Sequence, residues 1–266
     1  MKLGIVGHGF VGSAVDHGFT KNCDKYIIDP KLNNNSIKDL IEFGAEISFI
    51  CVPTPQAENG ECRTDIVFDV CSQLNTQRGH LVILKSTVPA YKLNQLQAIF
   101  KNIRLVYNPE FLTEKNYIQD FQNPPMHVFG GQEIDTKQVE TLYSEHSICR
   151  QCPVFHTDLA TASFVKYSIN SFLATKVTFF NELYDVFKAS GGKEFDKLTQ
   201  IMSTDPRIGV SHMKVPGNNG ERGYGGSCFP KDTAALAYFA REILNTPFTQ
   251  LETSIAINEK LRKTDH

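Results

Sequence analysis

The sequence predicts an α/β protein, a Rossmann-like doubly wound parallel sheet that is followed by an all-helical domain. Short apolar segments alternate with helical segments through the first half of the chain, as they do around a parallel sheet. A GxGxxG turn, GHGFVG, links the first apolar segment to the first helical one. From Asp158 onward only helical patterns remain. We therefore predict two domains, residues 1–157 and residues 158–266.

The composition is that of a globular protein. The chain has 266 residues, enough for one large domain or two ordinary ones. It is 41% hydrophobic and 21% charged, with a net charge of -2, so no basic excess points to nucleic acid or to a membrane surface. The longest apolar runs, such as residues 47–52, are too short to cross a bilayer. The chain enters its first strand directly, and we expect no signal peptide.

The cysteines do not suggest a disulfide framework. There are 7, an odd number, and they are scattered through the chain. We expect reduced thiols in a cytoplasmic protein. Cys149 and Cys152 form a lone CxxC, without a second Cys or His pair at the spacing of a zinc site, so we predict no metal.

The strands and helices expected in the first domain follow from hydrophobic periodicity. Strands are expected at residues 2–6, 26–28, 47–52, 81–85, 104–107 and 127–129. A first helix is expected to end at Phe19, and four further helices are expected at residues 37–43, 65–74, 91–100 and 134–144. In a parallel sheet of this kind, ligands bind beyond the carboxyl ends of the strands.

The GHGFVG turn has the setting of a dinucleotide-binding fingerprint, because a strand precedes it, a helix follows it and Asp29 ends the next strand. Its glycines would allow the tight turn, the approach of the pyrophosphate and the close packing of helix on strand. Asp29 should bind the adenine ribose and repel a 2′-phosphate, so NAD is predicted over NADP. The alternative is an ordinary glycine-rich turn with a surface aspartate. The expected cofactor contacts here are Gly7, Gly9, Phe10, Val11, Gly12 and Asp29.

Three polar or proline-rich segments follow strands of the predicted sheet. They are VPTP at residues 52–55, STVP at residues 86–89 and NPEFLTE at residues 108–114. Each could be a connecting loop and nothing more. Because all three fall at the ligand edge of one sheet, together they indicate a binding site.

The second domain is expected to contain helices at residues 158–188, 194–203, 231–244 and from residue 249 to the end. The first of these has no Pro or Gly and would make about eight turns, with Thr157 or Asp158 as its N-cap. Lys166 and Asn170 are one turn apart on this helix and share a face. A solvated helix face would explain Lys166 equally well.

The segment GYGGSCFPKD, residues 223–232, is the most unusual in the chain. Its glycines permit positive φ and the close approach of a ligand. Pro230 is expected to open a helix, which would place Cys228 at the positive end with Lys231 nearby. Both features lower the pKa of a thiol and favour the nucleophilic thiolate. The alternative is a glycine-rich turn with a structural cysteine.

Taken in order, six motifs resemble those of the UDP-glucose/GDP-mannose dehydrogenase family. They are GHGFVG, VPTP, STVP, NPEFLTE, FVKYSIN and GYGGSCFPKD, and the resemblance covers essentially the whole chain. It implies an NAD-dependent nucleotide-sugar 6-dehydrogenase, with UDP-glucose as the first candidate substrate. It also implies that the C6 alcohol is oxidised to a carboxylate, with two NAD⁺ and a covalent cysteine thioester.

The resemblance implies roles for individual residues in the two oxidations. Cys228 resembles the nucleophile of the family, which would hold the aldehyde as a thiohemiacetal and then as a thioester. Lys166 resembles the lysine that stabilises the developing oxyanion, and Asn170 resembles the amide beside it.

Further roles concern water, the cofactor and the substrate. Asp232 and Thr87 resemble the pair that positions a water, and Glu110 resembles the acid that assists thioester hydrolysis. The implied NAD contacts are Val52, Pro53, Thr54, Ser86, Thr87 and Glu114. The implied substrate contacts are Glu110, Phe111, Leu112, Lys166, Asn170, Tyr224, Gly225 and Cys228.

The sequence departs from the family in two places. The family continues after its central helix into a further α/β domain that closes over the nucleotide, whereas this sequence ends at His266. We therefore expect many of the contacts with UDP to be absent, and substrate binding to be weaker, unless a separate chain supplies these contacts. Lys115 follows Glu114 where the family usually has glycine, which could alter that loop or add a phosphate contact.

The resemblance also predicts a homodimer built on the helical half, since the last helical segment places apolar residues such as Leu251 and Leu261 among polar ones. Two other functions stay open. A 3-hydroxyacid dehydrogenase would use a lysine and an asparagine for one hydride transfer, without Cys228. An NAD-binding pseudoenzyme or partner subunit would bind the cofactor without turnover.

Overall fold

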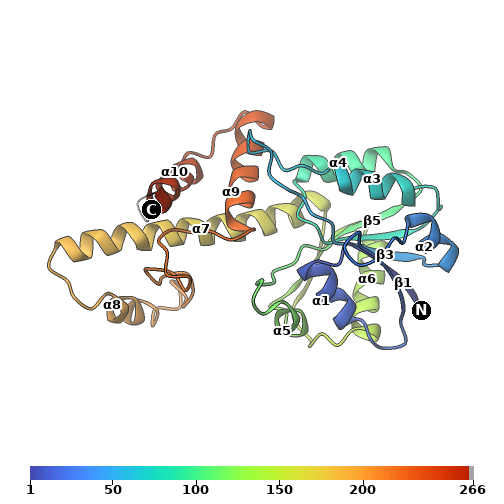
Figure 1. Cartoon of the computed structure of the whole chain (residues 1–266), viewed down its shortest axis with the longest axis horizontal. Coiled ribbons are helices and arrows are strands. Elements are labelled where there is room, and N and C mark those ends of the chain that lie inside the picture. Colours follow the sequence, from blue (N-terminus) through green and yellow to red (C-terminus); the bar gives the residue numbers. More distant parts are fainter. Residues whose placement is uncertain (264–266) are drawn as a thin grey trace. The chain divides into compact units, whose positions relative to one another are not determined.

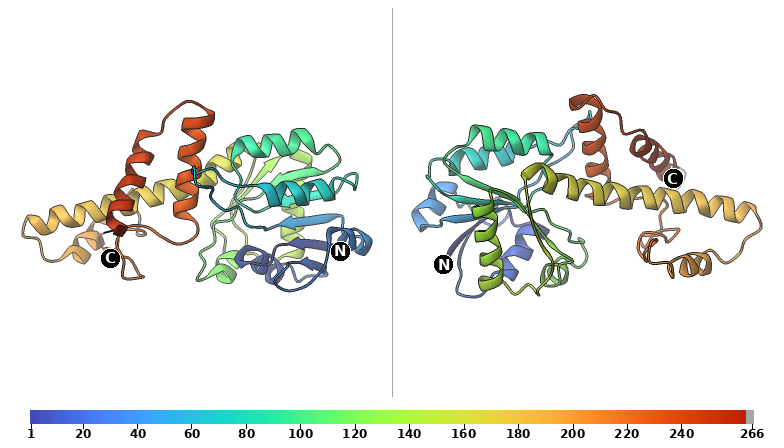
Figure 2. Two further views of the ribbon diagram at one scale, coloured as in Figure 1. Left: turned by 45° about the horizontal axis from the view of Figure 1, so that its top comes forward. Right: turned by 180° about the vertical axis from the view of Figure 1, so that it is seen from behind.

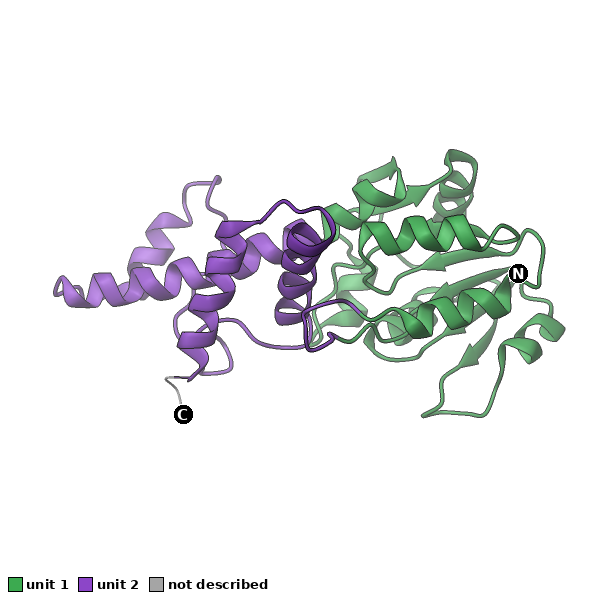
Figure 3. Ribbon diagram, turned by 90° about the horizontal axis from the view of Figure 1, so that it is seen from above, with its two compact units in different colours: residues 1–55, 63–166 green, residues 56–62, 167–266 purple. Residues whose placement is uncertain are grey.

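The computed structural model describes residues 1–263, which form two compact units (Figure 3). Unit 1 comprises Met1–Pro55 and Arg63–Lys166. Unit 2 comprises Gln56–Cys62 and Tyr167–His266, of which residues 264–266 lie outside the described part. The helix α7 (Leu159–Ala189) runs through the point of division. The domain boundary between residues 157 and 158 stays a prediction.

Unit 1 is built on a seven-stranded sheet with the strand order β2-β1-β3-β4-β5-β6-β7 (Figure 1). Its strands are β1 (Lys2–Val6), β2 (Asp24–Ile28), β3 (Ile47–Ile50), β4 (Leu81–Leu84), β5 (Arg104–Tyr107), β6 (His127–Gly131) and β7 (Val154–Thr157). Neighbouring strands are parallel except β5 and β6, which are antiparallel. The predicted Rossmann-like α/β fold is thereby confirmed, with one reversal near the β7 edge.

Helices cover both faces of this sheet (Figure 2). One face carries α2 (Ile37–Phe43), α3 (Asp65–Leu74) and α4 (Ala90–Ile99), and the other carries α1 (Phe10–Gly18), α5 (Tyr117–Gln122) and α6 (Glu133–His146). Successive side chains of one strand lie in the two cores alternately. Ile83 is buried in one core and Leu84 in the other, as the alternation of side chains along a strand requires.

Local sequence signals account for several helix ends. Ser36 and Asp39 form a capping box at the start of α2: Asp39 N donates to Ser36 Oγ at 3.2 Å, and Ser36 N donates to Asp39 Oδ2 at 2.9 Å. Gly44, with φ of 84°, ends this helix. Asp158 accepts from Thr161 N at 2.8 Å before α7. The helix predicted at residues 37–43 is confirmed, and of the two predicted N-cap candidates, Thr157 and Asp158, the structure has Asp158.

The carboxyl ends of four strands meet at one edge of the sheet. Val6 pairs with Ile50, Ile50 pairs with Leu84, and Leu84 pairs with Tyr107. GHGFVG and the three segments at residues 52–55, 86–89 and 108–114 therefore leave the sheet along a single line. Their predicted position beyond the carboxyl ends of the strands is confirmed.

Unit 2 is helical. Besides most of α7 it contains α8 (Phe195–Met202), α9 (Phe229–Tyr238), the π-helix η1 (Phe239–Ile243) and α10 (Thr249–Lys263). A small core joins α8 to α7 through Phe180 and Phe195, and α10 contacts α7 where the hydroxyls of Thr178 and Ser254 are 3.0 Å apart. The single helix predicted at residues 231–244 is α9 continued by η1.

Two short elements, α5 and β7, were not predicted from the sequence. Across residues 1–263, no helix combines the length and the apolar character that a membrane span needs.

Candidate active site

The GHGFVG turn in unit 1 fits a dinucleotide. Gly7 has φ of 88°, and a Cβ there would lie 2.6 Å from the carbonyl oxygen of Cys51. A Cβ on Gly12 would collide with the carbonyl oxygen of Gly7. Gly9, in contrast, has nothing within 4 Å of where its Cβ would be, so the backbone is open where it begins α1. Two glycines thus hold the turn, and the third leaves room for a pyrophosphate at a helix N-terminus.

Asp29 lies directly after β2 and beside this turn. Its carboxylate accepts from His8 N at 2.6 Å and from Lys31 N at 2.8 Å. The hydrogen bond from His8 holds the pKa of Asp29 below its usual range. Asp29 therefore carries a fixed negative charge where the ribose of a dinucleotide is expected. Phe10 is 52% exposed at the start of α1, with its ring 5.6 Å from that of Tyr117.

The segments after β3 and β4 are joined to each other. Ser86 Oγ donates to the carbonyl oxygen of Val52 at 2.7 Å. Val52, Thr54 and Ser86 are buried, Pro53 is exposed and Thr87 is half-buried. Their contacts with NAD stay predictions.

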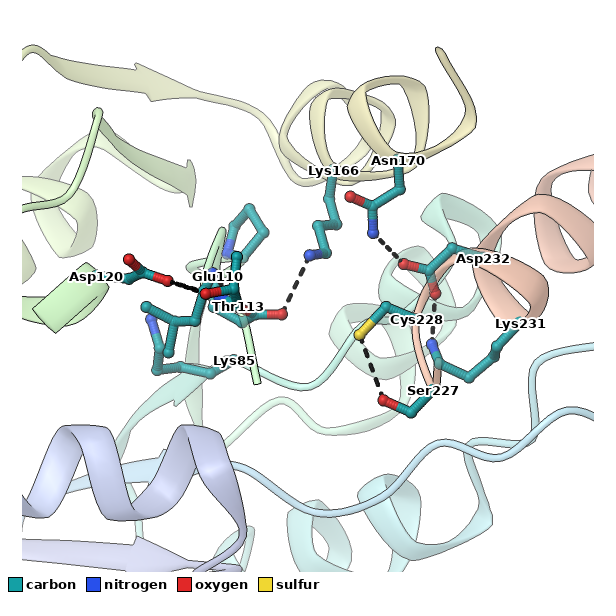
Figure 4. Close-up of polar contacts among 12 residues, drawn as sticks. Lys85, Glu110, Thr113, Asp120, Lys166, Asn170, Ser227, Cys228, Lys231 and Asp232 are labelled. Carbon is teal, nitrogen blue, oxygen red and sulfur yellow. Dashed lines mark hydrogen bonds and ion pairs between the residues drawn. The ribbon is translucent and has the colours of Figure 1, made fainter. Parts of the chain in front are cut away.

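The third segment carries an ion pair. Lys166 Nζ is 3.1 Å from Glu110 Oε1, and the two side chains are only 4% and 10% exposed (Figure 4). The other carboxylate oxygen of Glu110 accepts from Leu112 N at 2.6 Å. Lys166 Nζ also lies 5.6 Å from the ring centroid of Phe111. The structure therefore brings together four predicted site residues of unit 1, while Glu114 is exposed.

In unit 2 a buried carboxylate joins α7 to α9. Asp232 has no exposed surface, and its Oδ2 accepts from Asn170 Nδ2 at 2.6 Å (Figure 4). Lys231 Nζ lies 2.5 Å from the other oxygen, Oδ1. The ammonium of Lys231, which the sequence suggested as an activator of the thiol, thus forms an ion pair with Asp232.

Cys228 is the N-cap of α9, and Pro230 stands in the first turn, as predicted. The carbonyl oxygen of Cys228 accepts the first helical hydrogen bond, from Asp232 N at 2.9 Å. Its Sγ is 3.6 Å from Ser227 Oγ. A thiol at this position faces the positive end of the helix.

The glycine-rich turn before Cys228 is held by α10. The side chain of Asn258 binds both backbone groups of Tyr224: it accepts from the amide nitrogen at 2.6 Å and donates to the carbonyl oxygen at 3.0 Å. Gly223 and Gly226 have φ of 72° and 78°, which explains the need for glycine there. A Cβ on Gly225 would press on the guanidinium of Arg262 at 3.0 Å.

A hollow of about 510 Å³ lies beside this turn within unit 2. Gly225, Gly226, Pro230 and Arg262 are among the residues that line it. Tyr224 also touches it, although its side chain is buried. The substrate contacts at Tyr224 and Gly225 stay predictions.

The sequence interpretation missed several residues that hold the site. Asn258 and Arg262 were seen only as part of a terminal helix, and no signal in the sequence links them to residues 223–226. In and around the loop at residues 108–114, which carries Glu110, four further side chains had no predicted role. They are Lys85, Asn108, Asp120 and Tyr143.

Two matches to known proteins decide the family. Residues 25–147 match the NAD binding domain of the UDP-glucose/GDP-mannose dehydrogenase family, and residues 160–260 match its central domain. The chain belongs to this family. The resemblance read from the motifs is confirmed, and NAD is the cofactor that unit 1 of this family member is built to bind.

Individual relatives agree with this assignment. The UDP-glucose 6-dehydrogenase TuaD of Bacillus subtilis (strain 168) is 32% identical over 255 residues, which are 92% of this chain and 53% of the relative. The chain therefore spans about half the length of this curated relative. The structure of a UDP-glucose dehydrogenase from the archaeon Pyrobaculum islandicum matches with a TM-score of 0.81 and 25% identity, over 97% of this chain and 68% of that one.

The fold also extends beyond the family. The 3-hydroxyisobutyrate dehydrogenase of Mycobacterium tuberculosis matches with a TM-score of 0.74 over 97% of this chain and 92% of that one. Its sequence identity is only 15%, so the likeness concerns the fold alone.

Proposed function

We propose that the chain carries the chemistry of an NAD-dependent nucleotide-sugar 6-dehydrogenase, with UDP-glucose as the first candidate substrate. One observation carries the proposal: Cys228 starts α9, one turn before the buried Asp232 that Asn170 binds. A 3-hydroxyacid dehydrogenase would need no thiol at this point. The names of the relatives favour UDP-glucose among nucleotide sugars.

The first oxidation converts the C6 alcohol into an aldehyde. When bound, NAD⁺ supplies the hydride acceptor, one molecule for each of the two oxidations. A water bound by Asp232 takes the hydroxyl proton as the hydride leaves C6. The ammonium of Lys166 and the amide of Asn170 stabilise the negative charge that develops on the C6 oxygen.

Cys228 then makes the second oxidation possible. The positive end of α9 favours its thiolate, which adds to the aldehyde carbon while the oxygen takes up a proton, giving a thiohemiacetal. Loss of a hydride from the carbon and of the proton from the oxygen leaves a thioester. Water, assisted by Glu110, breaks the C–S bond and releases the carboxylate and the thiol. Overall, one alcohol, one water and two NAD⁺ give one carboxylate, two NADH and three protons.

Turnover of a panel of nucleotide sugars, with NADH counted per sugar consumed, tests this function. Two NADH per sugar would support it, whereas one would favour a single hydride transfer of the hydroxyacid type. NAD binding without any turnover would favour a partner subunit. Cys228→Ser should abolish formation of the sugar acid and leave NAD⁺ affinity unchanged, while Cys23→Ser, at a half-buried thiol of unit 1, should change neither.

We also propose a homodimer formed by the helical half. On α7, Phe172, Phe179 and Val186 are spaced seven residues apart and are 68%, 57% and 66% exposed. Apolar side chains at this spacing form one stripe, which a second copy would cover. A separate chain that completes the nucleotide site is the other candidate partner. A cytoplasmic location is supported by the seven cysteines, which are all thiols.

A further inference from the structure

A buried ammonium lies under the loop that carries Glu110. Lys85 follows β4 and is 4% exposed. Its Nζ donates to Asn108 Oδ1 at 3.0 Å, to the Asn108 carbonyl oxygen at 3.3 Å and to Tyr143 Oη at 3.4 Å, all neutral oxygens. Burial lowers the pKa of Lys85, and the negative charge of nearby Glu110 acts against this shift. Burying a cation among neutral oxygens costs free energy, so the contacts of Lys85 need a functional explanation.

Asn108 connects Lys85 to the loop at residues 108–114. It is 1% exposed and begins the segment that leads through Pro109 to Glu110. Its Oδ1 also accepts from Tyr143 Oη at 2.7 Å, and its Nδ2 donates to the carbonyl oxygen of Val128 at 3.1 Å. Strands β4 and β6 and helix α6 therefore converge on this one amide. The base of the loop is fixed two residues before Glu110.

The tip of the same loop is fixed by α5. Thr113 donates to Asp120 Oδ2 from its backbone nitrogen at 2.8 Å and from its hydroxyl at 2.6 Å (Figure 4). Between the two fixed ends, one oxygen of Glu110 is bound by Leu112 N and the other lies 3.1 Å from Lys166 Nζ. The direction of the carboxylate thus depends on where the ends of the loop are held.

Packing under the loop is incomplete. A cavity of about 30 Å³ lies there, and Lys85, Glu110, Asp120 and Tyr143 are among the residues that line it. This is room for about one water molecule. Phe111 and Leu112 pack against the two cores of unit 1 on either side of this hollow, and the hydrogen bonds at the two ends of the loop add to their hold on Glu110.

We propose that Lys85 and Asp120 are positioning residues that hold the two ends of the loop and so present the Glu110 carboxylate to Lys166. Lys85 acts through Asn108, and Asp120 acts through Thr113. The catalytic consequence, faster hydrolysis of the thioester by way of Glu110, rests on the proposed function. The geometric part can be measured without turnover.

Chemical labelling of Lys166 tests the geometry. The intact chain is treated with acetic anhydride, and mass spectrometry gives the labelling rate of Lys166 relative to Lys38, whose side chain is 84% exposed. Glu110→Gln should raise the rate about tenfold, the factor expected when one charge-assisted hydrogen bond is lost. Lys85→Met should raise it about threefold or more, and the double variant should label no faster than Glu110→Gln alone.

The direction of the change separates positioning from a simple charge effect. Removing the Lys85 charge alone would favour protonated Lys166 and slow the labelling, since the two cations repel each other. An unchanged or slower rate in Lys85→Met, or effects that multiply in the double variant, would overturn the proposal. Lys176→Met, at a lysine of unit 2 that donates to the carbonyl oxygen of Ile208, is the matched control and should leave Lys166 unchanged.

Asp120→Asn provides a second route, because Asp120 is half-buried at the loop tip and its replacement keeps the shape of the side chain. It should also speed the labelling of Lys166, and this effect should vanish in the Glu110→Gln background. An effect of equal size in both backgrounds would count against positioning.

The kinetic arm uses a nucleotide sugar and NAD⁺. Lys85→Met should slow thioester hydrolysis about tenfold to a hundredfold, while the KM for NAD⁺ stays unchanged. A chain without any turnover would reject the proposed function, and the labelling would still decide the geometry. Normal hydrolysis in Lys85→Met would reject the inference alone.

Discussion

Asn170 donates a 2.6 Å hydrogen bond to Asp232, a carboxylate with no exposed surface, and so joins α7 to α9. Lys231 neutralises the other oxygen of the same carboxylate. A charge without solvent access needs such donors, because the energy of removing it from water is not otherwise recovered. This contact fixes the start of the helix whose N-cap is Cys228.

Asn170→Ala should therefore affect both stability and chemistry. We expect the free energy of unfolding to fall by about 1–3 kcal/mol, since a buried acceptor loses a donor. The rate of the first oxidation should fall further than the loss of folded protein explains. Urea unfolding and single-turnover NADH formation measure the two effects. Asn102→Ala, which removes an exposed hydrogen bond of 2.9 Å from Asn102 Nδ2 to the carbonyl oxygen of Asn75, is the control and should leave the oxidation rate unchanged.

Glu110→Gln should separate oxidation from hydrolysis. The amide keeps the shape of the side chain but cannot assist the attack of water on the thioester. Oxidation should proceed to the thioester, and a protein–sugar adduct at Cys228 should accumulate and appear by mass spectrometry. Impaired turnover without any adduct would contradict this role. Glu58→Gln, at an exposed residue of a connecting loop, should release product at the normal rate.

The elements with strong local signals could be predicted from the sequence. The capping box of Ser36 and Asp39 defines the start of α2, and the absence of Pro and Gly defines the long α7. In contrast, β7 has only four residues, and its Phe155 is 53% exposed. It pairs on one side only, with β6, so no buried periodicity marks it. The reversal of β6 likewise depends on strand pairing, which a local pattern does not contain.

In the candidate site, too, contacts between residues far apart in the sequence could not be predicted. Cys228 and Asp232 are one helical turn apart, so their spacing could be read directly. Lys166 and Glu110 are 56 residues apart, and Lys85 is 58 residues from Tyr143. Lys85 looks like the last residue of a strand in the sequence. Its burial and its contact with Asn108 depend on the assembled sheet, and no periodicity predicts them.

Asp29 should make the protein prefer NAD⁺. A 2′-phosphate would meet a carboxylate that the backbone amides of His8 and Lys31 hold in its charged form, so we expect NADP⁺ to bind about tenfold more weakly or worse. Asp29→Ser should narrow the difference, and Asp24→Ser, at the exposed start of β2, should not. Titration calorimetry with both cofactors measures the ratio. Equal affinities in the unchanged protein would contradict this specificity.

His80 should make the fold sensitive to mild acid. It is 4% exposed, its Nε2 lies 2.9 Å from Ser48 Oγ, and burial lowers its pKa to about 4. An unfolded histidine has a pKa near 6.5, so between these values the unfolded chain binds a proton that the folded chain does not. Stability is therefore lost as the pH falls, by about 2 kcal/mol from pH 7 to pH 5.

His80→Gln removes this titration and should reduce the pH dependence of the unfolding free energy by that amount. Urea unfolding of both proteins at pH 7 and pH 5 gives the comparison. Burial also lowers the pKa of His127 to about 4, and because His127 is present in both proteins its contribution cancels. An identical pH dependence in the variant would show that His80 is not the group responsible.

The exposed stripe on α7 should hold two copies of the chain together. Phe179 is 57% exposed at its centre, and burying a side chain of this size contributes about 1.5–3 kcal/mol for each copy. A glutamate there would put two charges close to the symmetry axis of the dimer, where they would repel and lack solvent. Phe179→Glu should therefore give a monomer at micromolar concentration by light scattering, whereas the unchanged chain gives a dimer. Ile134→Glu is the matched control, because Ile134 is 77% exposed on α6 of the other unit. A monomeric unchanged chain, or equal dissociation by both substitutions, would rule out this stripe as the interface.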